Sequence, residues 1–416
     1  MSSKGKDTLK RVQSRELSEN EGSYVELHGW VHDSRALGKL TFLIIGDPYG
    51  YYQAVFKGEK AKLASQIPRQ SYVLLRGTIT KSKSEINPYE VQADYIEVLN
   101  EADRVLPLDP ASKVQSELMT RINNRPLDLR VEEERKVFIM RARVLSLIRE
   151  FLQSKGFIEV DTPKIIATAS EGGAELFKVD YFGKVAYLAQ SPQLYKEELT
   201  LSLGKVFEIA HYFRAEKSNT VKHLNEFTSV DIEAAMHTKF DVMSILEELI
   251  KFLHSRLKKE GYNVEEVSGS FPVYTYEEVC KSLGLKFGED LSTEALNEFG
   301  KDKSYYFIID WPLSLKPFYT MPKGNELSES FDLMYKGLEL ASGGQRIHSY
   351  DLLVERLKAN NLDPSSFSEH LKVYRWGMPP HSGWGLGLDR LMMVLANRSN
   401  IREVVLYPRD SKHLAP

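Results

Sequence analysis

The sequence predicts an α+β protein in which a small β-barrel is followed by a larger domain, built on an antiparallel sheet flanked by helices. Residues 23–100 contain five short β-rich runs with one helical segment between the third and fourth. Residues 101–130 carry three prolines without long periodicity, which is typical of a hinge. Residues 131–416 alternate between amphipathic helices and strands. We therefore expect domains at 1–100 and 131–416, joined by a linker at 101–130.

The composition indicates a globular protein with little net charge. Hydrophobic residues make up 42% of the chain, charged residues 27%, and the formal net charge is −3. A nucleic-acid partner would therefore need a local basic face. The one cysteine, Cys280, excludes an internal disulfide and a cysteine-rich zinc site, and suits a reducing cytoplasm. No apolar run has the length of a membrane span, and MSSKGKDTLKR lacks the apolar core of a signal peptide, so we expect a cytoplasmic protein without a membrane partner.

The five runs of the first domain predict an OB-fold. They are YVELHGWV, LTFLII, YYQAVF, SYVLLRGTIT and PYEVQADYIEVL, and EKAKLASQI has helical spacing. Such barrels bind single-stranded nucleic acid by stacking bases on aromatic side chains beside basic ones. Arg35, Phe42 and Gln53 are the candidate contacts. A structural reading stays open, because a strand phenylalanine is more often core and Arg35 also fits a solvated loop.

The stretch 206–235, VFEIAHYFRAEKSNTVKHLNEFTSVDIEAA, predicts a long antiparallel hairpin at the centre of the larger domain. Alternation in its second strand puts two sets of residues on opposite faces, Phe227, Ser229, Asp231 and Glu233 on one and Thr228, Val230 and Ile232 on the other. Charges on a half-buried sheet are costly unless they are paired. Either these charges form a structural ion network, or the loop binds a polyphosphate, with the planar guanidinium group of Arg214 making a bidentate contact to a phosphate.

This hairpin resembles motif 2 of the class II aminoacyl-tRNA synthetases, through FRAE, a loop and HLNEFTSVDIE. The resemblance implies that Arg214 holds the α-phosphate of ATP and that Phe227 stacks on the adenine. It places Glu216 near the adenine or the tRNA end, and His223 near the outer phosphates. It assigns the α-ammonium group of the amino acid to Asp231.

The run GWVHDSRALGKLTF…YYQAVF resembles the anticodon-binding domain of the aspartyl, asparaginyl and lysyl members of this class. The resemblance implies that Phe42 stacks on the central anticodon base and that Gln53 reads it, with Arg35 beside them. Gly46 departs from the family pattern, in which a charged residue is usual.

His32 and Pro88 bear on which tRNA is accepted. In the archaeal-type aspartyl members, a histidine and a proline at about these positions accompany relaxed reading of the third anticodon base and charging of both tRNA-Asp and tRNA-Asn. The alternative is that His32 is a loop histidine and Pro88 a strand opener. Charging of tRNA-Asn therefore stays open.

Two features precede the hairpin. The amphipathic run 132–156 followed by FIEVDTPKI resembles motif 1, which builds the dimer interface in this class, so we expect a homodimer. An ordinary packing helix is equally compatible with the run. Glu171, in the glycine-rich stretch ATASEGGAELFKV, matches a residue on a loop that closes over the amino acid.

The string QSPQLYK points to the amino acid. Ser191 is a good N-cap and Pro192 fits the first helical position. The string resembles the aspartyl members, which implies that Lys196 binds the side-chain carboxylate of aspartate and that Gln193 lines the same pocket. The asparaginyl members lack this lysine.

The segment FDLMYKGLELASGGQRIH carries oxygens suited to a hard cation such as Mg²⁺, from Asp332, Glu339 and Ser342. Without the resemblance these residues fit a capped strand end. With it, Glu339 and Ser342 match metal ligands assisted by Asp332, Glu339 also borders ATP, and Ser342 also borders the amino acid. Arg346 matches the arginine that makes a bidentate contact with the side-chain carboxylate of aspartate.

The segment GWGLGLDR, followed by an apolar helix, resembles motif 3. Its glycines permit close approach of the backbone to a nucleotide. The resemblance implies that Arg390 clamps the outer phosphates and that Arg214 and Arg390 are the catalytic residues.

Together these resemblances imply attachment of L-aspartate to tRNA with ATP and Mg²⁺, through an aspartyl-adenylate. The archaeal or eukaryotic type fits best, since residues 240–330 are too few for the domain inserted in the bacterial type. The stretch KPFYTMPKGNE, 316–326, also lacks the bacterial histidine pair near ATP. Two alternatives stay open, an asparaginyl or lysyl enzyme on the same architecture and a catalytically silent paralogue that only binds tRNA.

Overall fold

The computed structural model describes residues 9–112, 114–168, 176–217 and 219–415. The chain divides into two compact units, Met1–Lys136 and Val137–Pro416. Within the described ranges, no helix combines the length and the apolar character needed to cross a membrane.

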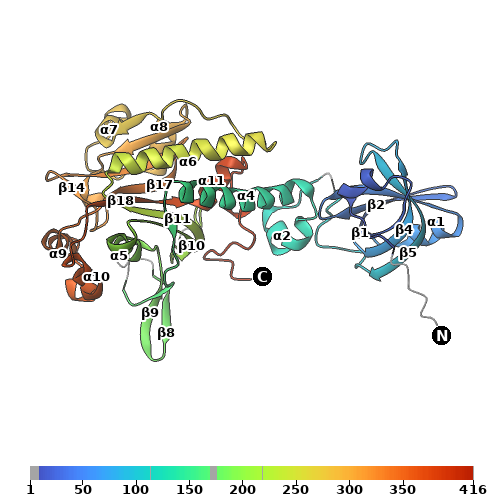
Figure 1. The fold of residues 1–416 in the computed structure, drawn as a ribbon, viewed down its shortest axis with the longest axis horizontal. Coiled ribbons are helices and arrows are strands. Elements are labelled where there is room, and N and C mark those ends of the chain that lie inside the picture. Colours follow the sequence, from blue (N-terminus) through green and yellow to red (C-terminus); the bar gives the residue numbers. More distant parts are fainter. Residues whose placement is uncertain (1–8, 113, 169–175, 218, 416) are drawn as a thin grey trace. The chain divides into compact units, whose positions relative to one another are not determined.

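The first unit contains the predicted OB-fold. Its described strands close into a barrel in the order β1-β2-β3-β5-β4 (Figure 1). The elements are β1 (Tyr24–Leu37), β2 (Leu40–Asp47), β3 (Gly50–Lys57), α1 (Gly58–Gln66), β4 (Tyr72–Lys81) and β5 (Tyr89–Asn100), preceded by the 3₁₀ turns η1 (Ser14–Glu16) and η2 (Ser18–Asn20). The helix falls between the third and fourth strands, as expected. Alternate side chains such as Leu43, Ile45 and Tyr52 are fully buried inside the barrel, which is the period of two that the sequence showed.

The residues expected to form a linker contain ordered structure. Two short helices, α2 (Leu118–Asn123) and α3 (Arg125–Asp128), enclose a buried ion network. Nε of Arg121 lies 2.8 Å from Asp128, and Nη1 of Arg125 lies 3.0 Å from the same carboxylate. Arg121 also pairs with Glu134. Buried charges are tolerated only when they are paired, and each of these buried side chains has a partner of opposite charge. The expected domain bounds themselves stay a prediction.

The second unit is built on an eight-stranded sheet in its described part, in the order β12-β13-β16-β17-β18-β11-β10-β6. The strands are β6 (Ile158–Glu159), β10 (Lys205–Phe213), β11 (Glu226–Ala235), β12 (Val273–Thr275), β13 (Tyr305–Ile309), β16 (Ser330–Tyr335), β17 (Leu338–Gln345) and β18 (His381–Gly387). Two smaller sheets contain β7 (Ile165–Ile166), β8 (Lys178–Tyr181) and β9 (Lys184–Leu188), and β14 (Pro322–Lys323) and β15 (Leu327–Ser328). The predicted central hairpin is confirmed as β10 and β11, whose antiparallel register pairs Glu208 with Asp231.

Helices cover the sheet. They are α4 (Glu132–Ser154), α5 (Gln193–Leu203), α6 (Lys239–Lys259), α7 (Tyr276–Leu283), α8 (Thr293–Gly300), α9 (Tyr350–Ala359), α10 (Ser368–Tyr374) and α11 (Leu388–Leu395), with the 3₁₀ turns η3 (Leu313–Leu315), η4 (Pro364–Phe367) and η5 (Ile401–Glu403). Apolar residues of α4, α6 and α11 pack with one face of the sheet in a single core. The opposite face of the hairpin is left for polar residues.

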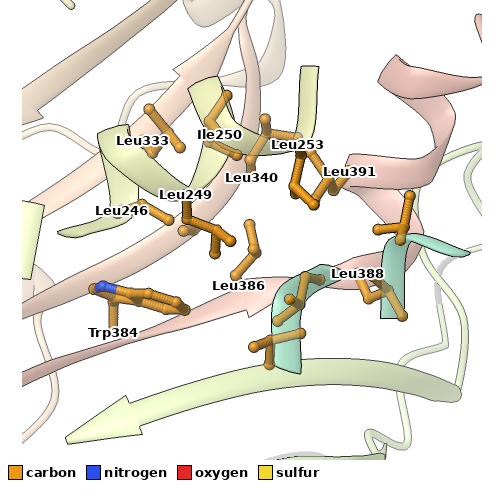
Figure 2. Packing of buried hydrophobic residues seen from close by; sticks show 14 of the residues in the cluster. Leu246, Leu249, Ile250, Leu253, Leu333, Leu340, Trp384, Leu386, Leu388 and Leu391 are labelled. Atoms are coloured by element: carbon orange, nitrogen blue, oxygen red, sulfur yellow. The ribbon is translucent and has the colours of Figure 1, made fainter. Parts of the chain in front are cut away.

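The centre of this core lies between α6 and β18. Figure 2 shows leucines of α6, among them Leu249, beside Leu386 and the indole ring of Trp384. Nε1 of Trp384 donates a hydrogen bond of 3.0 Å to the carbonyl oxygen of Val242, so the buried indole is satisfied. Thr238 and Asp241 form a capping box at the start of α6, which fixes where the apolar stripe of the helix begins.

Leu249→Ala tests this packing. Leu249 is fully buried, so truncation should leave a cavity and lower the free energy of unfolding by about 2–5 kcal/mol. Urea unfolding followed by circular dichroism measures the change. Leu203→Ala is the control, because Leu203 is 40% exposed in the same unit and should cost less. Equal losses for the two variants would contradict the core.

Candidate active site

The sheet face opposite the helical core opens into a cavity of about 490 Å³. The hairpin β10–β11 with its loop, the strands β17 and β18, and the start of α11 supply most of the walls. The cavity brings together ten of the residues predicted from sequence, namely Gln193, Arg214, Glu216, His223, Phe227, Asp231, Glu339, Ser342, Arg346 and Arg390.

Alternation along β11 explains this gathering. Val230 and Ile232 belong to the helical core, whereas Ser229 and Asp231 line the cavity. The two predicted faces of the strand are thus confirmed at these four positions, whereas Thr228, which was expected on the core face, also lines the cavity. The period of two converts one strand into both a core wall and the floor of a polar site.

At one end of the cavity, a guanidinium group lies over an aromatic ring. The guanidinium carbon of Arg214 is 5.4 Å from the ring centroid of Phe227. Nδ2 of Asn225 donates to the carbonyl oxygens of Arg214 (2.7 Å) and Glu216 (2.9 Å), which closes the loop at the end of β10. This arrangement presents an exposed planar cation and an aromatic face to the same space, as binding of a nucleotide would require.

Further along, the cavity carries a second group of cations. Nη1 of Arg390 donates 2.9 Å to the carbonyl oxygen of Glu339 and lies 3.5 Å from its carboxylate. Lys222 and His223 line the same wall. Burial, and then the neighbouring charges of Arg390 and Lys222, lower the pKa of His223 to about 4. His223 is therefore neutral at pH 7 and can donate or accept a hydrogen bond without adding charge.

At the other end, buried charges alternate in sign. Nζ of Lys196 lies 3.0 Å from Asp231 and 3.6 Å from Glu233, and Nε of Arg346 lies 3.2 Å from Glu233. Ser229 donates to the second oxygen of Asp231 at 2.6 Å. Lys196 itself does not line the cavity among the residues that the structure describes, and it lies beneath the floor, held by the two carboxylates. We call this set, Lys196, Asp231, Glu233 and Arg346, the charge chain.

Two glycines of β18 make room for the charge chain. A Cβ atom on Gly383 would lie 2.2 Å from Oε2 of Glu233, and one on Gly385 would lie 3.0 Å from Oδ1 of Asp231. The sequence suggested that glycines in this segment admit a nucleotide. The structure gives these two positions a different reason, the space that the carboxylates of the neighbouring strand occupy.

The candidate metal ligands lie in different environments. Glu339 and Ser342 line the cavity, whereas the carboxylate of Asp332 accepts hydrogen bonds of 3.0 and 2.9 Å from Nζ of Lys316. Burial raises the pKa of Asp332 although Lys316 acts against that rise. Within the described residues, no three His, Cys, Asp or Glu side chains converge on a metal site. One carboxylate and one hydroxyl still suit Mg²⁺, which usually takes one or two protein carboxylates together with phosphate oxygens. A metal role for Asp332 stays a prediction, and Glu171 lies outside the described residues.

Sequence reasoning missed a positioning residue, Arg141 on α4. Its Nη1 lies 2.6 Å from Asp389, and its Nη2 donates 2.9 Å to Oγ1 of Thr228. The backbone N–H of Thr228 donates 2.8 Å to the same Asp389. This triad holds the residues next to Phe227 and Arg390. The aspartate of GLDR was the available signal, because a buried acid beside a functional arginine needs a partner. Lys316 was also missed, within a stretch singled out only for lacking histidines.

The barrel of the first unit carries the candidate anticodon contacts on its outer face. Arg35 pairs across strands with Phe42, and Gln53 pairs with Ile44, two residues further along β2. Phe42 is half-buried while its neighbour Leu43 is in the barrel core, so the aromatic ring is on the outer side. Nε2 of Gln53 donates 2.7 Å to Glu90. The predicted set is thus brought together on one surface, and its contact with the anticodon stays a prediction.

Tyr51 connects the two residues expected to affect tRNA choice. Its ring centroid lies 4.6 Å from that of His32, and its carbonyl oxygen accepts from Asn87, the neighbour of Pro88. Tyr51 also explains the unusual Gly46. A Cβ atom there would lie 2.8 Å from the Tyr51 ring, so a charged side chain has no room.

Comparisons with known proteins agree with this geometry. A family model described as tRNA synthetases class II (D, K and N) matches residues 117–411, and one described as OB-fold nucleic acid binding domain matches residues 25–99. The chain is 46% identical to an aspartate--tRNA(Asp) ligase of Picrophilus torridus, covering 94% of this chain and 97% of the relative. It is 45% identical to an aspartate--tRNA(Asp/Asn) ligase of Methanocaldococcus jannaschii, covering 96% of each.

Solved structures show the same fold. An asparaginyl-tRNA synthetase from Pyrococcus horikoshii complexed with asparaginyl-adenylate matches with a TM-score of 0.90 and 30% identity, covering 97% of this chain and 99% of that one. A putative aspartyl-tRNA synthetase from Leishmania major matches with a TM-score of 0.89 and 28% identity, covering 100% and 97%.

The environment of His223 predicts the pKa of its imidazole in the free protein and the change in that pKa when ATP binds. The imidazole should titrate near pH 4 in the free protein, as measured by NMR of histidine ring resonances. A bound polyphosphate favours the protonated form, so ATP should raise this pKa. Between the free and the raised pKa, binding then takes up a proton and strengthens as pH falls. His223→Gln identifies the resonance, and a midpoint near 6.5 in the free protein would contradict the geometry.

Proposed function

The chain belongs to the class II tRNA synthetases of the aspartate, lysine and asparagine group, and from this premise we propose that it attaches L-aspartate to tRNA through an aspartyl-adenylate formed from ATP. The observation that carries the choice of amino acid is the charge chain, which places Arg346 at one end of the cavity and Lys196 directly beneath its floor. The other end holds Arg214, Phe227 and Arg390. One cavity thus has buried charges of both signs at one end and cationic and aromatic side chains at the other.

In the first step, an α-carboxylate oxygen of aspartate attacks the α-phosphorus of ATP. The new phosphorus–oxygen bond forms as the bond to the bridging oxygen breaks, and pyrophosphate leaves with that electron pair. The reactants repel each other, and each close charge pair is worth about 4 kcal/mol at an effective dielectric near 20. Arg214 at the α-phosphate and Arg390 at the outer phosphates offset this repulsion and hold the groups in line.

The chain needs no covalent nucleophile for this reaction. The substrate carboxylate is the nucleophile, and the protein positions it. Glu339 and Ser342 would hold Mg²⁺, which neutralises phosphate charge when bound. In the second step, the 3′-hydroxyl of the terminal tRNA adenosine attacks the carbonyl carbon of the adenylate, and AMP leaves.

Selection of aspartate over asparagine follows from the two cations. The side-chain carboxylate of aspartate can accept hydrogen bonds from both Lys196 and Arg346. The side-chain amide of asparagine would instead place its NH₂ group, a hydrogen-bond donor, against these donors. A site with such unmatched buried polar groups rejects the wrong substrate by roughly 10⁴-fold. Lys196, together with curated relatives that are named aspartate ligases, makes the asparaginyl alternative less favoured. The assembled cavity argues in the same way against a silent paralogue.

We infer a homodimer from α4 and β6, the helix and strand that resemble motif 1. Ile139 on α4 and Ile158 on β6 are 51% and 47% exposed, and a symmetric contact through these elements would bury them. The partner tRNA would meet the outer face of the barrel, where Arg35, Phe42 and Gln53 lie.

A second proposal concerns the range of tRNA. The contact of His32 with Tyr51, and of Tyr51 with the loop before Pro88, supports relaxed reading of the third anticodon base. One relative is named for tRNA(Asp) alone and another for tRNA(Asp/Asn), so relatives of similar identity differ in this property. We propose charging of both tRNAs.

Lys196→Leu tests the choice of amino acid. It leaves two buried carboxylates that repel the substrate side chain, so kcat/KM for aspartate-dependent pyrophosphate exchange should fall by roughly 10²–10⁴-fold, which corresponds to about 3–5 kcal/mol of lost transition-state stabilisation. Lys239→Leu is the matched control. Lys239 is equally buried and also pairs with two carboxylates, of Asp310 and Glu329, outside the cavity. Both variants should lose thermal stability, and only the first should lose aspartate activation. Near-normal exchange in folded Lys196→Leu would refute the assignment.

Charging of purified tRNA-Asp and tRNA-Asn transcripts, measured side by side, tests the second proposal. Both should accept aspartate. Transcripts with the central anticodon base replaced are the control and should lose charging, because that base is the one Phe42 and Gln53 would read. Charging of tRNA-Asp alone would show that the interpretation of His32 and Pro88 is wrong.

A further inference from the structure

A second buried carboxylate, Glu197, lies next to the charge chain, where its charge interacts with that of Arg346. It follows Lys196 on α5, is fully buried, and is one helical turn from Gln193, which lines the cavity. Nε2 of Gln193 donates a short hydrogen bond to its Oε1, and the hydroxyl of Tyr374 donates 2.5 Å to its Oε2. This places a buried acid directly behind a cavity-lining amide.

Two histidines complete the surroundings of Glu197. Nε2 of His381 lies 3.7 Å from its Oε2, and Nε2 of His370 lies 3.8 Å away. The other ring nitrogens are occupied, Nδ1 of His381 by the carbonyl oxygen of Pro379 and Nδ1 of His370 by Glu198. Although burial opposes ionisation, the nearby positive charges of His381, His370 and Arg346 hold the pKa of Glu197 at about 2. The group is therefore a carboxylate throughout the working range of pH.

An ionised carboxylate can only accept hydrogen bonds, and this constrains Gln193. The amide of glutamine has a donor end and an acceptor end. One N–H of the amide bonds to Glu197, which turns the NH₂ end of Gln193 toward that carboxylate and leaves the carbonyl oxygen for the cavity. In aspartate the one strong donor is the α-ammonium group, so a carbonyl oxygen attracts that group and repels the side-chain carboxylate.

We propose that Glu197 is a positioning residue for amino-acid binding, which acts by fixing the amide of Gln193 with its carbonyl oxygen toward the cavity. The inference rests on the proposed function and deepens it. It changes the expected role of Gln193 from a lining of the carboxylate pocket to an acceptor for the α-ammonium group. Without Glu197 the amide can turn over and present its donors, which disfavours the same substrate.

A purely structural role is the competing explanation. Glu197 accepts from Tyr374 on α10 and so also holds α5 to α10. That role predicts a loss of stability without a specific effect on aspartate. The positioning role predicts a raised KM for aspartate, an unchanged KM for ATP, and dependence on Gln193.

The experiment is aspartate-dependent pyrophosphate exchange with Glu197→Met, Glu197→Gln, Gln193→Met and the double variant Glu197→Met/Gln193→Met. Loss of one well-placed hydrogen bond should raise KM for aspartate about tenfold in Glu197→Met. Glu197→Gln keeps a carbonyl acceptor for Gln193 and should recover most of this loss. In the double variant, removal of Glu197 should add nothing to the effect of Gln193→Met, because the two act as one unit.

Tyr374→Phe separates folding from positioning. It removes the other donor to Glu197 and leaves the bond to Gln193, so KM for aspartate should not change. Should Glu197→Met alone fail to fold, its combination with Tyr374→Phe removes the hydroxyl that would be left unpaired, and the same rise in KM is expected. A folded variant lacking the carboxylate with unchanged KM for aspartate overturns the inference, as does additivity in the double variant. Absence of aspartate-dependent exchange in the unsubstituted enzyme would instead overturn the proposed function.

Discussion

The charge chain is the constraint on which the catalytic unit depends. Lys196 and Arg346 are both nearly inaccessible to solvent, as are Asp231 and Glu233 between them. Neither pair of like charges would be stable alone in such a site, since an unpaired buried charge costs several kcal/mol. Their alternation makes the set stable while the cations remain close to the cavity. Under the proposed function, a substrate carboxylate would become a further anion near cations that are already held in place, and would need little reorganisation of the protein.

The rest of the unit holds this set rigid. The carboxylates come from one face of β11, whose other face is tied into the core by Val230 and Ile232. Strand β18 lies beside β11, and its glycines leave room for the acids while Trp384 between them packs into the core. The same alternation therefore produces an apolar wall and a polar floor from two adjacent strands. A shift of one residue in their register would exchange the two, which makes the position of the charge chain as firmly specified as the core.

Local pattern predicted much of this architecture, and the limits of that prediction are physical. The five barrel strands, the hairpin and the two faces of β11 follow from periodicity within one segment. Residues carried by a motif, such as Arg214, Phe227 and Arg390, were identified and lie in one cavity. The residues that pair with the buried acids of this unit were not identified. Lys316 on Asp332, Arg141 on Asp389 and Tyr374 on Glu197 join segments far apart in the chain, and no spacing rule reports such contacts. The buried ion network of α2 and α3 joins residues that are close in sequence, and it was overlooked because the prolines and the missing periodicity of this stretch indicated a hinge.

These distant partners show how the nucleotide end is coupled to the rest of the unit. Arg141 belongs to α4, the helix that resembles motif 1, and it binds both Asp389 beside Arg390 and Thr228 beside Phe227. Movement of α4 along its axis would therefore displace the aromatic ring and the guanidinium group together. A single side chain therefore joins the neighbour of the aromatic ring to the neighbour of the guanidinium group. The helix α4 is thereby tied to both β11 and α11, so the packing of this one helix supports two separate walls of the cavity.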